Sequence, residues 1–313
     1  MNFGLSTKIF FPQRLTPGLL SALANSGVRV IELFAGRHHF DYNDRSQVRD
    51  LAAWFRSNDV LPTLHAPVSS GNYFSRHSSP DINLVSTNKA VRIEAMEEIK
   101  RALESAEHIP FSTCVLHLGL PPAMEEAHWS DYTFEYALTA IEHLKAFAAP
   151  LGVRLLLENL PNEIATPAHL LAILRIGHFD SCGICFDVAH AHLDEAGIAP
   201  ALESLRPRIA EIHLSDNAGR QGALVDQHLW PASGTERPLS AARGTIDWQA
   251  TYELARSFPS ETPLMLEIAD VEAATPEAVT RMAREVISES IRLQEVASLN
   301  PSEPLSDSKE GLN

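Results

Sequence analysis

One stretch of the chain, EIHLSDNAGRQGALVDQH at residues 211–228, gathers side chains that suit a divalent metal ion. It contains His213, Asp216, Asp226 and His228. Imidazole and carboxylate ligands together favour zinc, manganese or iron over calcium. The apolar residues around His213 predict a short buried strand, and the polar residues that follow it predict a turn-rich loop. Taken alone, the segment also fits a solvated loop that carries two histidines by chance.

The same pattern, an ionisable residue at the end of an apolar run, recurs along the chain. Six expected strands end at His65, His117, Glu158, Asp187, His213 and Glu267, and three further residues, His190, Asp226 and His228, follow just beyond strand ends. One ionisable group in such a place is more often a structural residue of the core. Six in succession indicate a shared site, because the carboxylates brought together would repel and take up protons unless cations lay between them. The sequence therefore predicts bound metal.

These residues are positioned by short apolar strands that alternate with amphipathic helices. The expected strands cover residues 3–6, 28–34, 61–65, 113–117, 153–158, 183–187, 210–214 and 263–267. The expected helices cover residues 17–27, 45–57, 85–108, 131–149, 198–206 and 247–257, and two more begin at Pro167 and Pro276, each after a capping threonine.

Eight strand–helix units favour an α/β fold, a parallel sheet closed into a (β/α)8 TIM barrel, with the site at the carboxyl ends of its strands. An open doubly wound sheet is the alternative. It requires a glycine-rich turn after the first strand, and the sequence there, GLSTKIFFP, has none. We expect one barrel domain over residues 1–298 and a disordered tail over residues 299–313, where polar residues occur without periodicity.

Composition disfavours two classes of partner. The net charge of -15 opposes binding to nucleic acid or to anionic membranes. Three cysteines form no disulfide framework, and Cys182 and Cys185 are expected as core thiols on opposite faces of a strand. The first residues lack the features of a signal peptide and no apolar run is long enough to span a bilayer, which predicts a cytoplasmic location.

In this order of strands and ionisable residues, residues 3–296 resemble the xylose-isomerase-like barrel superfamily. It includes sugar isomerases and epimerases, and also apurinic endonucleases of the endonuclease IV type. The segment GICFDVAH at residues 183–190 resembles the aspartate-to-histidine motif of the endonucleases, and HLSDNAGRQGALVDQH resembles their HLNDSK…DRH motif. The resemblance implies a common metal site formed by Glu158, Asp187, His213 and Glu267.

The endonuclease branch adds five ligands to make a trinuclear zinc site, and the resemblance implies a candidate for each. At one ion, His65 and His117 would join Glu158. The common site would hold a second ion, and the third would be bound by His190, Asp226 and His228.

Three departures fall where the endonucleases place groups that face DNA. Ala-Pro-Val follows His65, Asn-Ala follows Asp216, and Gln227 stands between the last two candidate ligands. The metals are therefore expected, whereas nucleic acid is an unfavoured partner. The segment HAP after the third strand, and the loop that runs on to GTIDW, also look like barrels assigned as sugar or sugar-phosphate isomerases.

The leading hypothesis is a divalent-metal-dependent isomerase or epimerase of a small sugar, sugar phosphate or polyol derivative, with one to three zinc or manganese ions. Glu158 and Glu267 would transfer the proton through a metal-stabilised enediolate, and His190 or Arg220 would hold a hydroxyl or the developing oxyanion. The residues expected to contact substrate or to orient ligands are Glu32, Asn159, Asp216 and Arg220.

Two alternatives remain open from the sequence. One is an endonuclease IV-like trinuclear zinc phosphodiester hydrolase, which the full ligand set favours and the three departures oppose. The other is a non-catalytic barrel in which the metal is structural. A homo-oligomer is compatible with either.

Overall fold

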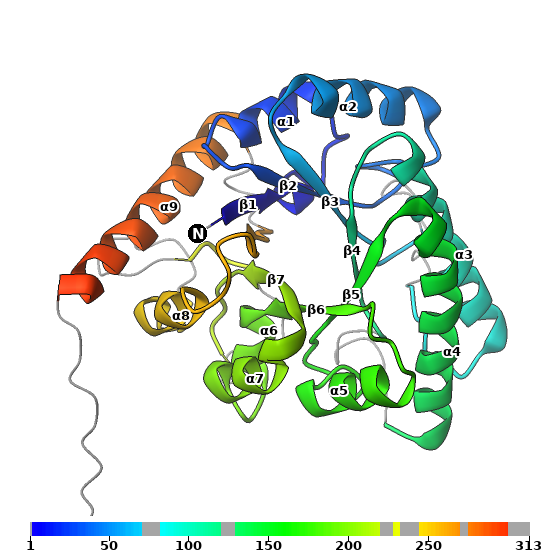
Figure 1. The fold of residues 1–313 in the computed structure, drawn as a ribbon. Coiled ribbons are helices and arrows are strands. Elements are labelled where there is room, and N and C mark those ends of the chain that lie inside the picture. The colour runs from blue at the N-terminus through cyan, green and yellow to red at the C-terminus, as the bar shows by residue number, and fades with distance from the viewer. Residues whose placement is uncertain are drawn as a thin grey trace, which may run out of the picture.

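The structure, a computed structural model, describes residues 2–70, 82–119, 129–219, 228–231, 244–269 and 275–299. Within these residues the chain forms a closed barrel of parallel strands in the order β1 to β8, as the sequence predicts. Figure 1 shows the strands at the centre with the helices arranged around them. The last helix lies along the outside of the barrel beside the first.

The strands are short and nearly continuous in apolar residues, as strands covered on both faces should be. Their bounds are β1 Asn2–Ser6, β2 Val30–Phe34, β3 Leu61–His65, β4 Thr113–Leu116, β5 Arg154–Glu158, β6 Gly183–Asp187, β7 Ile209–Leu214 and β8 Pro263–Leu266. Two expected site residues, His117 and Glu267, therefore lie one position beyond their strands.

The helices cover the outside of this barrel and bury one face each against it. Their bounds are α1 Pro17–Ala24, α2 Arg45–Ser57, α3 Lys89–Glu104, α4 Asp131–Ala148, α5 Pro167–Ile176, α6 Val188–Leu193, α7 Ile198–Leu205, α8 Trp248–Ala255 and α9 Pro276–Leu299. Thr16 and Thr166 cap α1 and α5 as expected, each accepting a hydrogen bond from a backbone N–H of the first turn.

Two expectations about helices need correction. The helix expected over residues 85–108 is shorter, because the side chain of Asn88 caps it by accepting from the backbone of Ala90 and because a 3-10 turn, Ser105–Glu107, follows it. The sequence analysis also missed α6, which is too short to show a helical period. Its first turn is capped by Asp187, whose carboxylate accepts a hydrogen bond from the backbone of His190 at 2.7 Å.

Side chains of the strands alternate between the barrel interior and the helices. In the middle of the interior Val115, Leu156 and Cys185 form a small apolar cluster. The three cysteines are free and buried, as expected.

Of the expected tail, residues 300–313 lie outside the described residues, as do the parts of the long seventh loop at 220–227 and 232–243.

Candidate metal centre

Four residues from four consecutive strands meet at the carboxyl end of the barrel. Glu158 ends β5, Asp187 ends β6, His213 lies near the end of β7, and Glu267 follows β8. One ligand atom from each lies within 4.8 Å of the others, and all four side chains are buried. The structure thus brings together the four residues that the sequence analysis assigned to a common metal site.

The atoms that these residues present to one another fit a cation. Among the described residues, Oε1 of Glu158, Oδ2 of Asp187, Nδ1 of His213 and Oε2 of Glu267 are buried and have no hydrogen-bond partner. A buried carboxylate oxygen without a partner is costly, and a divalent ion would satisfy all four atoms at once. Two kinds of donor, imidazole nitrogen and carboxylate oxygen, suit zinc or manganese.

A second group of candidate ligands shares Glu158 with the first. Nε2 of His117 lies 3.0 Å from Oε2 of Glu158, and Nε2 of His65 lies 3.3 Å from the same oxygen. The ring of His65 is held from its other side, because Nδ1 contacts the carbonyl of Ala66 at 2.7 Å and Phe34 stacks on the ring. One ligand atom from each of the three lies within 4.8 Å of the others, so this group could hold an ion that Glu158 bridges to the first.

Neighbouring cationic and imidazole groups keep two of the carboxylates ionised. Burial alone would raise the pKa of Glu158, but the imidazoles of His117, His190 and His65 hold this pKa well below its usual value. Burial likewise opposes ionisation of Glu267, and Lys8 with two histidines holds its pKa well below the usual range.

Asp187 differs from these two carboxylates, because burial raises its pKa above the usual value. The negative charges of Glu158 and Glu267 add to the effect of burial on this pKa. A bound cation would reverse this shift.

The third group of expected ligands is only partly described. His190 contacts the backbone carbonyl of Asn159 through Nδ1 at 3.0 Å, and His228 contacts Oε2 of Glu267 through Nδ1 at 3.3 Å. Asp226 and Arg220 lie outside the described residues. Within the part of the chain that the structure describes, neither His190 nor His228 belongs to a group with metal-ligand spacing.

Lys8 is a site residue that the sequence analysis missed. It lies in the 3-10 helix Thr7–Phe10 directly after β1, and its Nζ lies 2.9 Å from Nε2 of His228 and 3.2 Å from Oε1 of Glu267. The signal was present, since a lysine two residues beyond the end of a barrel strand falls on the face that carries the chemistry. In the described structure, its ammonium lies at Nε2 of His228, while Nδ1 of the same ring faces Glu267.

The residues expected to orient ligands have different surroundings. Asn159 joins the ends of β5 and β6, because its side chain donates to the carbonyl of Asp187 at 2.9 Å and accepts from the backbone N–H of Asp187 at 2.8 Å. That arrangement fits a residue that fixes a metal ligand. Glu32, in contrast, is fully buried below the site rather than at its mouth, where a substrate would bind.

Asp216 holds the seventh loop. Its carboxylate accepts hydrogen bonds from the indole of Trp248 at 2.8 Å and from the backbone of Ile246 at 3.2 Å, and its backbone pairs with Leu229 beside His228. Gly244 lies so close that a Cβ there would be 1.8 Å from Cγ of Asp216. These contacts anchor the seventh loop to Asp216, and its expected contact with substrate or with a metal ligand stays a prediction.

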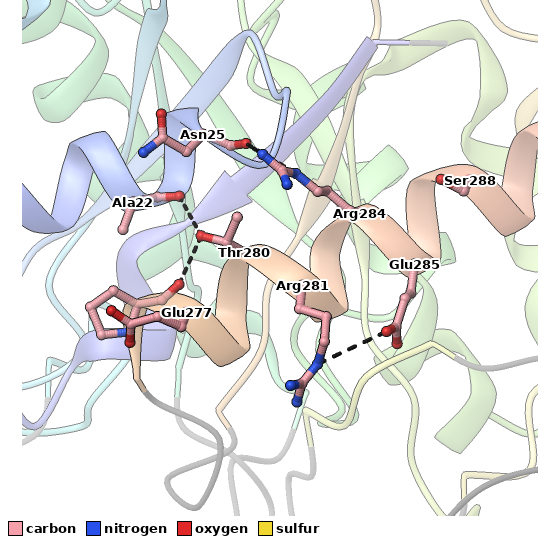
Figure 2. A pocket seen from close by; sticks show the side chains of 9 residues that line it. Ala22, Asn25, Glu277, Thr280, Arg281, Arg284, Glu285 and Ser288 are labelled. Atoms are coloured by element: carbon pink, nitrogen blue, oxygen red, sulfur yellow. Dashed lines mark hydrogen bonds and ion pairs between the residues drawn. The ribbon is translucent and has the colours of Figure 1, made fainter.

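A groove on the outside of the barrel lies between α1 and α9 (Figure 2). There the hydroxyl of Thr280 donates to the carbonyl of Ala22, and Arg284 donates to the carbonyl of Asn25. These bonds attach the last helix to the first. The groove contains none of the metal-ligand groups, so it does not compete with the barrel mouth as a catalytic site.

Comparison with known proteins identifies the family. A sequence model described as "Xylose isomerase-like TIM barrel" matches residues 20–290. The chain belongs to the xylose isomerase-like TIM barrel family. A curated relative, an uncharacterized protein of Methanocaldococcus jannaschii, is 27% identical over 239 residues, which cover 73% of this chain and 74% of the relative.

Solved structures of this family superpose on almost the whole chain. A D-tagatose 3-epimerase-like protein is 23% identical with a TM-score of 0.69, covering 95% of this chain and 100% of its own. The D-psicose 3-epimerase of Clostridium cellulolyticum H10 is 14% identical with a TM-score of 0.70, covering 94% and 99%. The IOLI protein with a binding zinc atom is 17% identical with a TM-score of 0.71, covering 93% and 98%. At these identities the likeness establishes the fold.

In the described residues, no helix is long and apolar enough to cross a membrane.

Proposed function

We propose that this protein is a divalent-metal-dependent isomerase or epimerase of a small sugar, sugar phosphate or polyol derivative. The observation that carries the proposal is the group of four buried residues at the barrel mouth, each with a side-chain atom that lacks a hydrogen-bond partner among the described residues. The substrate class is supported by family members of the same fold whose names are D-psicose 3-epimerase and L-ribulose 3-epimerase.

The proposed ligands of the ion are Glu158, Asp187, His213 and Glu267. When bound, a zinc or manganese ion would polarise a substrate carbonyl and stabilise the negative charge that develops when a proton leaves the neighbouring carbon. Asn159 would keep Asp187 in place through its two hydrogen bonds to the backbone of that residue.

Glu158 and Glu267 are the proposed proton-transfer pair. Both are kept ionised by their neighbours, so each can accept a proton from carbon at neutral pH. They project from β5 and from the end of β8, which are not adjacent in the barrel. In an epimerisation one ionised carboxylate would take the proton from one face of the substrate, and the other, after taking up a proton from solvent, would deliver that proton to the opposite face.

His190 is proposed to hold a substrate hydroxyl or the developing oxyanion. Its Nδ1 donates to the carbonyl of Asn159, which fixes the orientation of the ring. Helix α6 begins directly after β6, the strand that ends in Asp187, and it carries the ring of His190 to the side of Glu158. Nδ1 of His190 lies 3.2 Å from Oε1 of Glu158. Arg220, the other candidate for this role, remains a sequence-based expectation.

The proposal is tested by exchange of a substrate C–H proton with solvent. Metal-free protein is reloaded with manganese or zinc and incubated in D2O with ketoses and sugar phosphates, and exchange is followed by proton NMR. We expect exchange with the loaded wild type and at least a 100-fold loss in Glu158→Gln, the lower end for a general base. Exchange retained in that variant would remove Glu158 from the proton-transfer pair.

Phosphodiester hydrolysis is a second candidate, which one observation favours. The group of His65, His117 and Glu158 has the spacing of a second ion site that shares a carboxylate with the first, and two-ion sites are common in enzymes that cleave phosphate esters. Incubation with a duplex oligonucleotide containing one abasic site tests it. Cleavage that needs two or more zinc ions per chain would place this activity ahead of isomerisation.

A further inference from the structure

Two buried carboxylates lie one layer below the candidate metal site, in the middle of the barrel. Glu32 is on β2 and Glu211 is on β7, and both are almost completely buried. The interior of a TM barrel is normally filled by branched apolar side chains at this level, as it is here by Val115 and Leu156. Burying a pair of carboxylates in this layer lowers the stability of the barrel unless other groups compensate their charge.

Both carboxylates lie at ion-pair distance from the same imidazole nitrogen, and neither this nitrogen nor the two oxygens that face it have a hydrogen-bond partner among the described residues. Nε2 of His213 lies 3.2 Å from Oε2 of Glu32 and 3.5 Å from Oε1 of Glu211. Strands β2 and β7 are separated by β8 and β1 in the barrel, so Glu32 reaches His213 across the interior. Glu32 therefore approaches His213 from the opposite side of the barrel, whereas Glu211 approaches it from the same strand.

The other nitrogen of the same ring faces the proposed metal ligands. Nδ1 of His213 lies 3.5 Å from Oε2 of Glu267 and 3.9 Å from Oε1 of Glu158. His213 thus separates two sets of carboxylates, one at the mouth and one below it. A neutral imidazole carries one ring proton, and it can ligate a metal through one nitrogen only when the proton is on the other.

The lower pair has histidines as its charged neighbours in the described part of the chain, His213 in contact and His65 through its charge. Within the described residues, neither Glu32 nor Glu211 forms an ion pair with a lysine or an arginine, and both oxygens of Glu32 and Oε1 of Glu211 lack a hydrogen-bond partner. Thr63, which pairs with Glu32 in the sheet register, also has an unpartnered hydroxyl, so it does not satisfy the carboxylate. The common partner of the two glutamates is the metal-facing histidine.

We infer that Glu32 and Glu211 form a positioning pair that holds the proton of His213 on Nε2 and thereby presents Nδ1 to the divalent ion. Carboxylates that accept the second N–H of a ligand histidine fix its orientation and increase its basicity, and their loss typically weakens metal binding 10–100-fold. The inference rests on the proposed metal site. It assigns a role to Glu211, which the sequence analysis did not single out, and replaces the expected substrate contact of Glu32.

Direct binding of a second ion by the lower group is the competing arrangement. Glu32, Glu211 and His213 have one ligand atom each within 4.8 Å of one another, which suits a cation as well. The two arrangements compete for Nε2 of His213, because a ring proton and a metal ion cannot occupy the same nitrogen. The number of ions per chain separates them.

The test measures binding of manganese alone, so it needs no substrate. Metal-free wild type, Glu32→Gln, Glu211→Gln and the double variant are titrated with Mn²⁺, and free Mn²⁺ is read by electron paramagnetic resonance. We expect one ion per chain in the wild type and a 10–100-fold larger Kd in each single variant. Thr63→Val, a change of similar size in the same layer, is the matched control and should leave Kd within about twofold.

A double-mutant cycle distinguishes positioning from a general loss of negative charge. In a His213→Ala background, Glu32→Gln should change Kd less than threefold, because the histidine that transmits the effect is gone. If Glu32 acted only through its long-range charge, Glu32→Gln would change Kd by the same factor in the His213→Ala background as in the wild type. Thermal unfolding of the metal-free variants is measured beside it, since a purely structural pair would lower the melting temperature and leave Kd unchanged.

Two outcomes overturn the inference. One is an unchanged Kd in both single variants, and the other is two ions per wild-type chain falling to one in the double variant, which would make the lower group a metal site. Asp187→Asn shows whether the underlying site is the reason for a failure. If the wild type does not bind Mn²⁺, or binds it with the same Kd as Asp187→Asn, the proposed metal site fails. The proposed function then fails with it.

Discussion

The side-chain Nζ of Lys8 lies 3.2 Å from Oε1 of Glu267, so a lysine that follows the first strand meets a glutamate that follows the last. The contact is possible because β1 and β8 are paired neighbours that close the barrel. Glu267 is buried, and the ammonium helps to hold its pKa well below the usual range. Lys8 therefore contributes, with His228 and His213, to keeping a proposed proton-transfer group ionised.

Lys8→Met should lower kcat/KM by roughly 10-fold to 100-fold, the equivalent of about 1.5–3 kcal/mol for a hydrogen bond to a charged group. Without the ammonium the pKa of Glu267 rises, so the acid limb of the pH profile of kcat/KM should move to higher pH. The profile is measured with a substrate found by the exchange assay, and Lys8→Arg, which keeps the charge, should move it less. An unchanged profile in Lys8→Met would show that Lys8 does not tune this carboxylate.

The metal content of the purified protein should be close to one divalent ion per chain. Asp187→Asn should lose most of it, whereas His228→Ala should keep it, because both ring nitrogens of His228 face other side chains, Lys8 at Nε2 and Glu267 at Nδ1. Inductively coupled plasma mass spectrometry of unchelated protein gives the count. About three zinc ions in the wild type, falling by one in His228→Ala, would contradict this expectation and support phosphodiester hydrolysis.

Much of the fold and of the site could be predicted because barrels repeat one rule. Each strand shows as a short apolar run, and the side chain at its carboxyl end belongs to the active face. This rule placed six residues at one face without coordinates, and the resemblance to the family then singled out Glu158, Asp187, His213 and Glu267. Chain order places them on successive strands, and closure of the barrel brings them together.

What the sequence could not give depends on contacts across the barrel. Glu211 looks like a polar residue at the edge of a strand, and its direction becomes clear only when the inward positions are known. Glu32 was singled out, but nothing in the chain order indicates that it meets His213 from a strand that is not adjacent. Short elements were also missed, since α6 has too few residues for a period.

Asp216→Ala should lower stability by about 1–3 kcal/mol, because it leaves the buried indole N–H of Trp248 and a backbone N–H of the seventh loop without their acceptor. The loop carries His228, so kcat should fall as well, while KM changes little. Chemical denaturation and steady-state kinetics measure the two effects. A large rise in KM with unchanged stability would instead restore the substrate contact that the sequence suggested.

A buried ion-pair network away from the site links α3 to the segment after β2. Glu98 accepts hydrogen bonds from Nε and Nη2 of Arg37, at 2.7 and 2.6 Å, and also from Tyr42 and Arg101. Burial alone would raise the pKa of Glu98, but these partners together hold it below its usual value of 4.5. The network therefore contributes stability only while Glu98 is ionised.

Glu98→Gln should cost about 2 kcal/mol at pH 7, within the range for charge-assisted hydrogen bonds of a buried group. Because the pKa of Glu98 is lower in the folded than in the unfolded chain, the wild-type advantage is complete above the unfolded value and disappears as pH falls through the folded one. Urea unfolding at pH 7, 5 and 4 should show the difference between the two proteins shrinking towards acid. Glu97→Gln is the control, since Glu97 is half exposed, pairs only with Lys100 in the described contacts and should cost under about 0.5 kcal/mol. A difference for Glu98→Gln that stays constant with pH would mean that side-chain packing, rather than charge, makes the contribution.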